Sequence, residues 1–294
     1  MATFVSNTRE VQVVAGIVNV ASVRQLSPFR YPGGKTWLVP TISSWLRRGQ
    51  RKFSILIDPF AGGGSVPLGL LSEDIVERIV LGEIDPEVSA VWKCIFGPEN
   101  ESLCRRIRAF PISRTSVLKE LSRSPASEVD RAFQVLLKNR TFRGGILAPG
   151  ASLMKVGENG NGVASRWYPE TLVKRLRSLA CLGSSVTFEE GDAFQLIRRY
   201  VNQTDVAFFI DPPYTAGNGK RAGRRLYKHN ELDHQALFAL LSGASGLVLM
   251  TYDDCPEVIE MAADHGFAVE RVPMKSTHHE KKFELLISNF GWNA

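Results

Sequence analysis

Short apolar runs rich in β-branched and aromatic residues alternate along this chain with longer stretches of helical periodicity. The short runs predict buried strands, and the stretches between them predict helices. The predicted strands, in chain order, are 54–57, 78–82, 185–188, 206–210, 246–250, 267–272 and 283–288. Strands that alternate with helices are typical of an α/β protein with a mainly parallel sheet. Only residues 273–282 separate the last two strands, which is too short for a helical crossover, so we expect that pair to be antiparallel.

One segment, 97–168, interrupts this alternation. Helical patterns at 103–110 and 127–137 are followed by a glycine-rich, irregular stretch over 139–161. The cluster of Gly157, Gly160 and Gly162 predicts a tight hairpin or a mobile loop. We therefore expect 97–168 to be a mainly helical insertion with a hairpin, placed between two parts of one sheet domain, 27–96 and 169–294. Residues 1–26 are expected to be an N-terminal extension.

Composition narrows the class of protein only a little. Of the 294 residues, 44% are hydrophobic, which is enough for a real core and argues against global disorder. The formal net charge of +6 favours a polyanionic partner, although many soluble proteins are equally basic. No apolar run approaches the roughly 20 residues needed to span a bilayer. The run 11–23 lacks the flanks of a signal peptide, so we expect a cytoplasmic protein.

The cysteines argue against a metal site. The four cysteines are scattered, with no CxxC and no histidine at ligand spacing. Reduced, buried thiols are the ordinary state of such residues. No metal is therefore expected.

A glycine loop follows the first predicted strand, in Asp58-Pro59-Phe60-Ala61-Gly62-Gly63-Gly64-Ser65. Glycines there permit a tight turn and close approach of a nucleotide-type ligand, although a plain turn is also compatible with them. GxxxxGK[ST] is missing from this loop, which excludes a Walker-type phosphate site. Asp58 would repel a pyrophosphate but could accept hydrogen bonds from an ammonium group. After the next strand, Glu83, or as second choice Asp85, is placed to bond ribose hydroxyls.

The tetrapeptide Asp211-Pro212-Pro213-Tyr214 directly follows the strand 206–210. The prolines are stiff, lack N–H donors and cannot continue a central strand. They leave the Asp211 carboxylate and the Pro212 carbonyl as two acceptors that can hold an amino group at the end of the sheet. Tyr214 offers an aromatic face for a base, and stacking of this kind is worth about 1–3 kcal/mol.

Together these motifs resemble the Dam-like DNA adenine N6-methyltransferases. The matching segments occur in the family's order and cover most of residues 28–290. They are Pro28 to Lys35 (PFRYPGGK), the 58–65 loop, Glu83, Gly191-Asp192-Ala193-Phe194, the Asp-Pro-Pro-Tyr tetrapeptide and Glu284 to Asn289 (ELLISN). The resemblance implies a Rossmann-like methyltransferase fold, S-adenosylmethionine as cofactor, and N6 of a flipped adenine in double-stranded DNA as the methyl acceptor.

The resemblance also implies residue roles. Asp211, Pro212, Pro213 and Tyr214 would act on the target base. The cofactor would be bound by Tyr31, Lys35, Asp58, Phe60, Gly62, Gly64, Glu83, Asp192, Ala193 and Asp211. The family often has Trp in place of Tyr31 and Glu in place of Asp58, so this chain departs from the usual pattern at both positions.

In this family the insertion recognises the target sequence. Arg and Asn are the side chains that recognise G and A edges with paired hydrogen bonds, and the stretch 138–145 contains both types. The predicted DNA-binding residues are Asn139, Arg140, Arg143, Lys155, Arg166, Lys220 and Arg224. The last two lie in a basic stretch after Tyr214 that is expected to be a mobile loop following phosphates. A solvated surface charge is the alternative for each single basic residue.

Three alternatives stay open. The acceptor could be N4 of cytosine or a base in RNA, since the chemistry at the tetrapeptide is nearly the same. The chain could be a catalytically silent DNA-binding module on a methyltransferase fold. A nicotinamide-dependent oxidoreductase would match the glycine loop but leaves the tetrapeptide unexplained. A restriction endonuclease is a candidate partner, and a monomer is the expected state.

Overall fold

A computed structural model describes residues 22–30, 34–48, 53–214, 232–275 and 281–291. Its centre is a seven-stranded sheet in the order β3-β2-β1-β4-β5-β7-β6. The strands are β1 (Phe53–Asp58), β2 (Val76–Glu83), β3 (Val186–Glu190), β4 (Val206–Ile210), β5 (Leu247–Asp253), β6 (Ala268–Lys275) and β7 (Lys281–Ser288). All seven strands predicted from the sequence are present. The sheet is parallel from β3 to β5, and β7 is antiparallel to both β5 and β6, as predicted.

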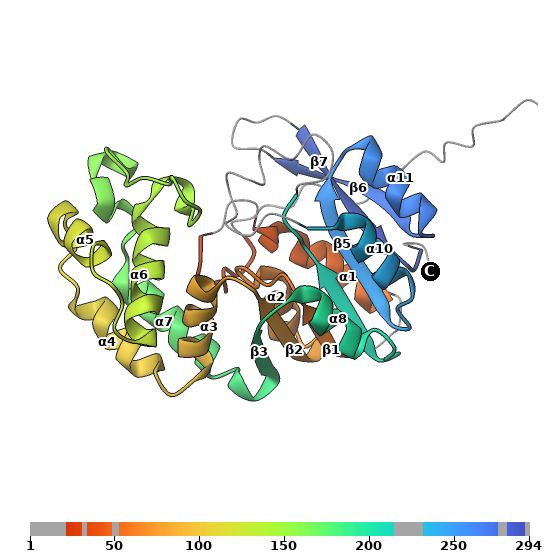
Figure 1. The fold of residues 1–294 in the computed structure, drawn as a ribbon, viewed down its shortest axis with the longest axis horizontal. Helices are drawn as coiled ribbons and strands as arrows, with labels where there is room; N and C mark the ends of the chain where they lie inside the picture. The colour runs from red at the N-terminus through yellow and green to blue at the C-terminus, as the bar shows by residue number, and fades with distance from the viewer. Residues whose placement is uncertain (1–21, 31–33, 49–52, 215–231, 276–280, 292–294) are drawn as a thin grey trace, which may run out of the picture.

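Helices cover both faces of this sheet (Figure 1). On one face lie α1 (Val39–Arg48), α2 (Ser65–Ser72) and α3 (Pro86–Phe96), and on the other α8 (Ala193–Tyr200), α10 (His234–Ser242) and α11 (Pro256–Asp264). Because side chains alternate along a strand, Phe208 and Phe209 of β4 enter the two opposite cores. Burial on both faces explains why the central strands are continuously apolar.

The remaining helices form a lobe at the side of α3 (Figure 1). They are α4 (Asn100–Ala109), α5 (Arg114–Leu121), α6 (Glu128–Thr141) and α7 (Pro169–Ala180). Trp92 of α3, Phe133 of α6 and Leu176 of α7 are fully buried in the same core as one face of the sheet. The lobe is thus packed on the sheet domain rather than tethered to it. Helix α7, placed with the sheet domain in the predicted division of the chain, contacts α4 of the lobe as well as α3.

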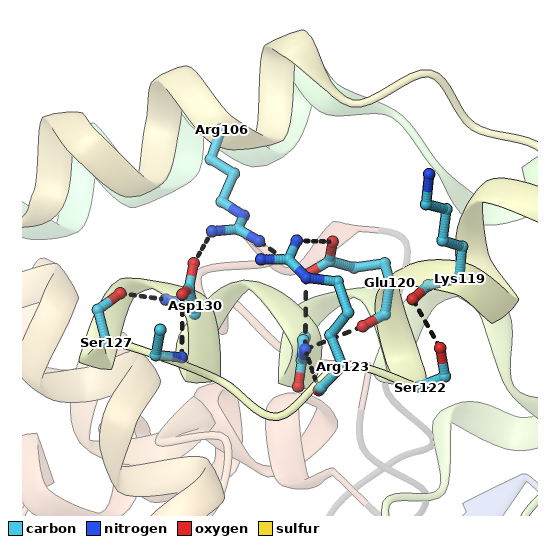
Figure 2. Close-up of polar contacts among 9 residues, drawn as sticks. Arg106, Lys119, Glu120, Ser122, Arg123, Ser127 and Asp130 are labelled. Atoms are coloured by element: carbon cyan, nitrogen blue, oxygen red, sulfur yellow. Dashed lines mark hydrogen bonds and ion pairs between the residues drawn. The ribbon is translucent and has the colours of Figure 1, made fainter.

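A polar network joins three helices of this lobe (Figure 2). Arg106 of α4 donates to the buried Glu120 of α5 at 2.7 Å and pairs with Asp130 of α6. Gln134 of α6 donates to the backbone carbonyls of Glu120 and Arg123 at 3.0 and 2.9 Å. These bonds hold α4, α5 and α6 in one fixed arrangement.

The segment between α6 and α7 differs in part from the prediction. Helix α6 extends to Thr141, beyond the predicted start of irregular structure. A single antiparallel bridge joins Phe142 and Leu153, ahead of the glycine cluster where a hairpin or a mobile loop was expected. Short 3-10 turns follow: η3 (Arg143–Gly145), η4 (Glu158–Gly160) and η5 (Gly162–Arg166). Gly157, Gly160 and Gly162 all have positive φ, so the glycine cluster forms consecutive tight turns.

Candidate active site

Four acidic residues follow four neighbouring strands at one edge of the sheet. Asp58 ends β1, Glu83 ends β2, Asp192 comes two residues after β3, and Asp211 follows β4. Because these strands are parallel, their carboxyl ends meet at the same edge, which is where ligands bind in open α/β sheets. The structure therefore brings the predicted acids to one edge.

The glycine loop between β1 and α2 is shaped by Glu83 and a tryptophan. Gly62 and Gly64 have φ of 45° and 60°, in the left-handed region that favours glycine. The Gly62 N–H donates to Glu83 Oε2 at 3.1 Å, and Trp92 Nε1 donates to the Gly62 carbonyl at 3.0 Å. A Cβ at Gly64 would lie 3.3 Å from the Trp92 ring. The loop is thus held against the end of β2.

Of the strand-end carboxyls, Asp58 is buried and Glu83 is half-buried. Asp58 is 2% exposed, and one of its oxygens accepts from the Phe60 N–H at 3.2 Å. Burial, followed by the charge of Asp211, raises the pKa of Asp58 well above its ordinary value. Burial also raises the pKa of Glu83 to about 7, although Oε1 accepts from the Asp85 N–H at 2.9 Å. Burial and neighbouring acids both disfavour the ionised forms of these carboxyls, so a cationic ligand at this edge would stabilise them.

Asp211 is held by donors from three parts of the chain. Its Oδ1 accepts from Thr251 Oγ1 at 2.7 Å and from the Tyr214 hydroxyl at 2.9 Å. Lys35 Nζ lies 3.3 Å from the same oxygen and 4.8 Å from the centre of the Tyr214 ring. Tyr214 stacks on Tyr252 with ring centroids 5.8 Å apart. Among the residues that the structure describes, these hydrogen bonds and the ion pair of this carboxylate all involve Oδ1.

The other predicted cofactor residues have more varied positions. Asp192 is exposed, and its carboxylate caps α8 by accepting from the Gln195 N–H at 3.1 Å, while Ala193 beside it is buried. Phe60 is half-buried in the glycine loop. Lys35 is 5% exposed and pairs with Asp211. Tyr31, Lys220 and Arg224 lie outside the described residues.

Direct base recognition by Asn139 is corrected by the structure. This side chain is fully buried, accepts from the Arg30 N–H at 2.8 Å, and donates to the carbonyls of Gly145 and Arg30 at 2.8 and 3.2 Å. An amide that is enclosed and already bonded cannot reach a base edge. Its role is to join the end of α6 to the segment before Lys35.

Arg140 is also no base-recognising side chain, because it is 8% exposed and donates to the Pro28 carbonyl at 2.8 Å. It instead lines a hollow of about 600 Å³ together with Arg30, Arg166 and Arg175. None of the residues that line this hollow, all within the described part of the chain, is acidic. Burial, then the charges of Arg175 and Arg30, lower the pKa of Arg140 to about 9. The hollow is therefore strongly positive.

Arg143 and Lys155, two further predicted DNA contacts, are exposed on the segment between α6 and α7. The Arg143 N–H donates to the Ser152 carbonyl at 2.9 Å, which keeps the two strands of this segment together. Their exposure is compatible with a contact to DNA.

Several residues of the site have no role in the predictions made from the sequence. Thr251 lies within β5, directly after the strand 246–250 that the sequence predicts, so its position was a usable signal. Glu284 lies 3.6 Å from Lys35 and is an acid between the apolar residues Phe283 and Leu285 of β7. Arg175 shows only the pattern of an ordinary helix surface, and no sequence signal pointed to it.

Among the residues that the structure describes, no cluster of three or more His, Cys, Asp or Glu side chains could hold a metal ion. In the same part of the chain, no helix is long and apolar enough to cross a membrane.

The sheet order with its antiparallel β7 is that of the Rossmann-like methyltransferase fold predicted from the sequence, with acidic residues at its ligand edge. Residues 31–121 match the family model of the D12 class N6 adenine-specific DNA methyltransferases. This match covers less than half of the chain, and it supports the resemblance to DNA adenine methyltransferases that the motifs indicated. S-adenosylmethionine fits the residues present, because its ammonium and sulfonium charges suit the carboxylates gathered at this edge.

The solved structures that match this chain are only distantly similar to it. A protein from Pyrococcus horikoshii described as an RNA methyltransferase has a TM-score of 0.40 and 12% identity, with 92% of each chain covered. The tRNA methyltransferase TrmK of B. subtilis has a TM-score of 0.36 and 9% identity, covering 86% of this chain and 65% of its own. An Agrobacterium tumefaciens SAM-dependent methyltransferase has a TM-score of 0.37 and 10% identity, covering 85% of this chain and 60% of its own. No curated protein matched.

Proposed function

We propose that this protein is a site-specific DNA methyltransferase that transfers a methyl group from S-adenosylmethionine to the N6 amino group of a flipped adenine. The observation that carries the proposal is the arrangement around Asp211. Thr251, Tyr214 and Lys35 all contact Oδ1. In the proposal, Oδ2 would accept from one N–H of the target amino group, and the Pro212 carbonyl, which is next in the chain, would accept from the other.

These two acceptors address the chemical difficulty of the reaction. The lone pair of an exocyclic amino group is delocalised into the ring, so the nitrogen attacks a methyl group poorly. Hydrogen bonds to both hydrogens favour a tetrahedral nitrogen, and correct alignment with the methyl donor can be worth roughly 7–11 kcal/mol. The sulfonium supplies an activated methyl group when the cofactor is bound. Stacking of the base on Tyr214, whose hydroxyl fixes Asp211, is part of the proposal.

The cofactor would lie along the ends of β1, β2 and β3. Asp58 would accept from its ammonium group, and this contact would return the counterion that the buried carboxylate lacks. Glu83 shapes the glycine loop and keeps lone pairs for the ribose hydroxyls. Asp192, at the N-terminus of α8, would bond the adenine end of the cofactor. Gly62 and Gly64 would allow the close backbone approach.

Duplex DNA is the proposed partner because of the arginine hollow and the exposed cations beside it. The hollow opens between the segment before Lys35 and helices α6 and α7, and it is lined by four arginines. Arginine guanidinium groups suit phosphate oxygens, and phosphate contacts hold a protein in register on a duplex. Arg143 and Lys155 on the neighbouring turns would extend this contact. Segment 97–168 is proposed as the target-recognition domain, with 27–96 and 169–294 as the catalytic domain.

One alternative is a methyltransferase whose acceptor is an amino group of cytosine or of RNA. A second alternative is a DNA-binding module without catalytic activity. The intact Asp211 network argues against the silent module, because it has no evident purpose without a substrate. A monomer, a cytoplasmic location and a restriction endonuclease partner remain predictions.

The proposed catalytic role is tested with Asp211→Asn. The variant should lose methyl transfer to DNA by at least about a hundredfold, since an amide cannot act as a charged acceptor. Cofactor affinity, measured by calorimetry, should stay within about threefold of wild type. Near-normal turnover by the variant would remove Asp211 from the mechanism.

A further inference from the structure

Glu284, on β7, is the second acid in contact with Lys35. It pairs across the sheet with Asp253 of β5, and it is 6% exposed. Its Oε2 lies 3.6 Å from Lys35 Nζ, slightly beyond hydrogen-bond length, and has no hydrogen-bond partner among the described residues. Lys35 Nζ lies 3.3 Å from Asp211 Oδ1 on its other side. The buried Lys35 ammonium therefore lies between two carboxylates, the buried one of Glu284 and the half-buried one of Asp211.

This sharing affects how strongly Asp211 can accept a hydrogen bond. An ammonium that contacts only Asp211 would neutralise the carboxylate, and a neutralised carboxylate holds the target amino group less tightly. A second carboxylate on the opposite side of Lys35 draws part of that positive charge away. Because water is largely excluded from Lys35, which is 5% exposed, these charges interact with little screening.

We propose that Glu284 is a positioning residue for methyl transfer: by sharing the Lys35 ammonium, it keeps the Asp211 carboxylate a strong acceptor for the target amino group. The proposal rests on the proposed function of Asp211. Nothing requires Glu284 itself to touch the base or the cofactor.

The charge state of Glu284 should change near neutral pH. Burial raises its pKa to about 7, with Lys35 lowering it and the carboxylates of Asp211 and Asp253 raising it. These are the charged groups that face it from η2 (Lys35–Leu38), from the end of β4 and from β5. Below this pH the protonated acid leaves Lys35 to Asp211. Above it the ionised acid competes for Lys35, so kcat should rise with pH.

The test compares the pH dependence of kcat for wild type, Glu284→Gln and Glu284→Asp, with short duplex DNA and S-adenosylmethionine as substrates. Wild type should show a rise in kcat between about pH 6 and pH 8. Glu284→Gln keeps the shape but removes the charge, so kcat should fall about tenfold at pH 8 and the rise should disappear. KM for DNA should change less than about twofold. Glu284→Asp keeps the charge, so it should recover part of the kcat at pH 8 and part of the rise with pH.

Glu270→Gln is the matched control. Glu270 is equally buried at 6% exposed, on the neighbouring strand β6, and its substitution should leave the rise with pH in place. A wild-type kcat that is flat from pH 6 to 8, or a Glu284→Gln profile that matches wild type, would overturn the positioning role. If that happens while Asp211→Asn is inactive, the proposed function survives. Wild-type protein that transfers no methyl group would overturn both.

Discussion

The buried amide of Asn139 allows a prediction that separates a structural residue from a base-recognising one. Asn139→Ala removes the acceptor for the Arg30 N–H and the donors to the carbonyls of Arg30 and Gly145. Each buried hydrogen bond contributes about 1 kcal/mol net, so the three together predict a loss of about 3 kcal/mol in the free energy of unfolding. The free energy of unfolding of a typical domain is only about 5–15 kcal/mol, so this loss is large.

Urea unfolding followed by circular dichroism measures this change. Asn161→Ala is the control, because Asn161 is exposed and its side chain makes no cap. The control should stay within about 0.5 kcal/mol of wild type. At a temperature where Asn139→Ala is folded, its preferred DNA sequence should be unchanged. A variant as stable as wild type but methylating different sites would refute the structural role and restore base recognition.

Three further predictions concern charge. Asp58→Asn should weaken S-adenosylmethionine binding by at least about tenfold in calorimetry, because it removes the counterion of the ammonium group, and an unchanged Kd would exclude this role. Since burial holds the pKa of Glu83 near 7, above its ordinary 4.5, its contribution to the stability of the cofactor-free protein should fall as pH rises between these values. Glu83→Gln should flatten that part of the melting-temperature profile, and an unaltered slope would contradict the shift. Arg175→Ala should weaken DNA binding about equally for all sequences and reduce the dependence of log K on log salt by about one unit; a change confined to one sequence would contradict phosphate contact.

The fold could be predicted from the sequence because its signals are local. The run 206–210 is buried at every position, and such a strand in a parallel sheet has to be continuously apolar. The short connection between β6 and β7 left only an antiparallel pairing. Acids placed directly after strands predicted one edge of the sheet, because parallel strands bring their ends together. These inferences needed only the neighbouring residues.

The parts that were missed depend on contacts between distant residues. Lys35 could be predicted near the cofactor by resemblance, but its position between Asp211 and Glu284 follows from the packing of η2 against β4 and β7. The role of Asn139 could not be predicted from the sequence either. An amide can bond a base or a backbone carbonyl equally well, and only burial decides between them. The hairpin expected near Gly157 became tight turns because glycine permits both.

The central claim is that the target is the N6 amino group of adenine in DNA. The most direct measurement incubates the purified protein with duplex DNA and S-adenosylmethionine carrying a labelled methyl group, then digests the DNA to nucleosides and separates them by mass spectrometry. We expect the label in N6-methyladenosine of the deoxy series, and none with Asp211→Asn. Label in N4-methylcytosine, label only when RNA is supplied, or no transfer at all would contradict the account.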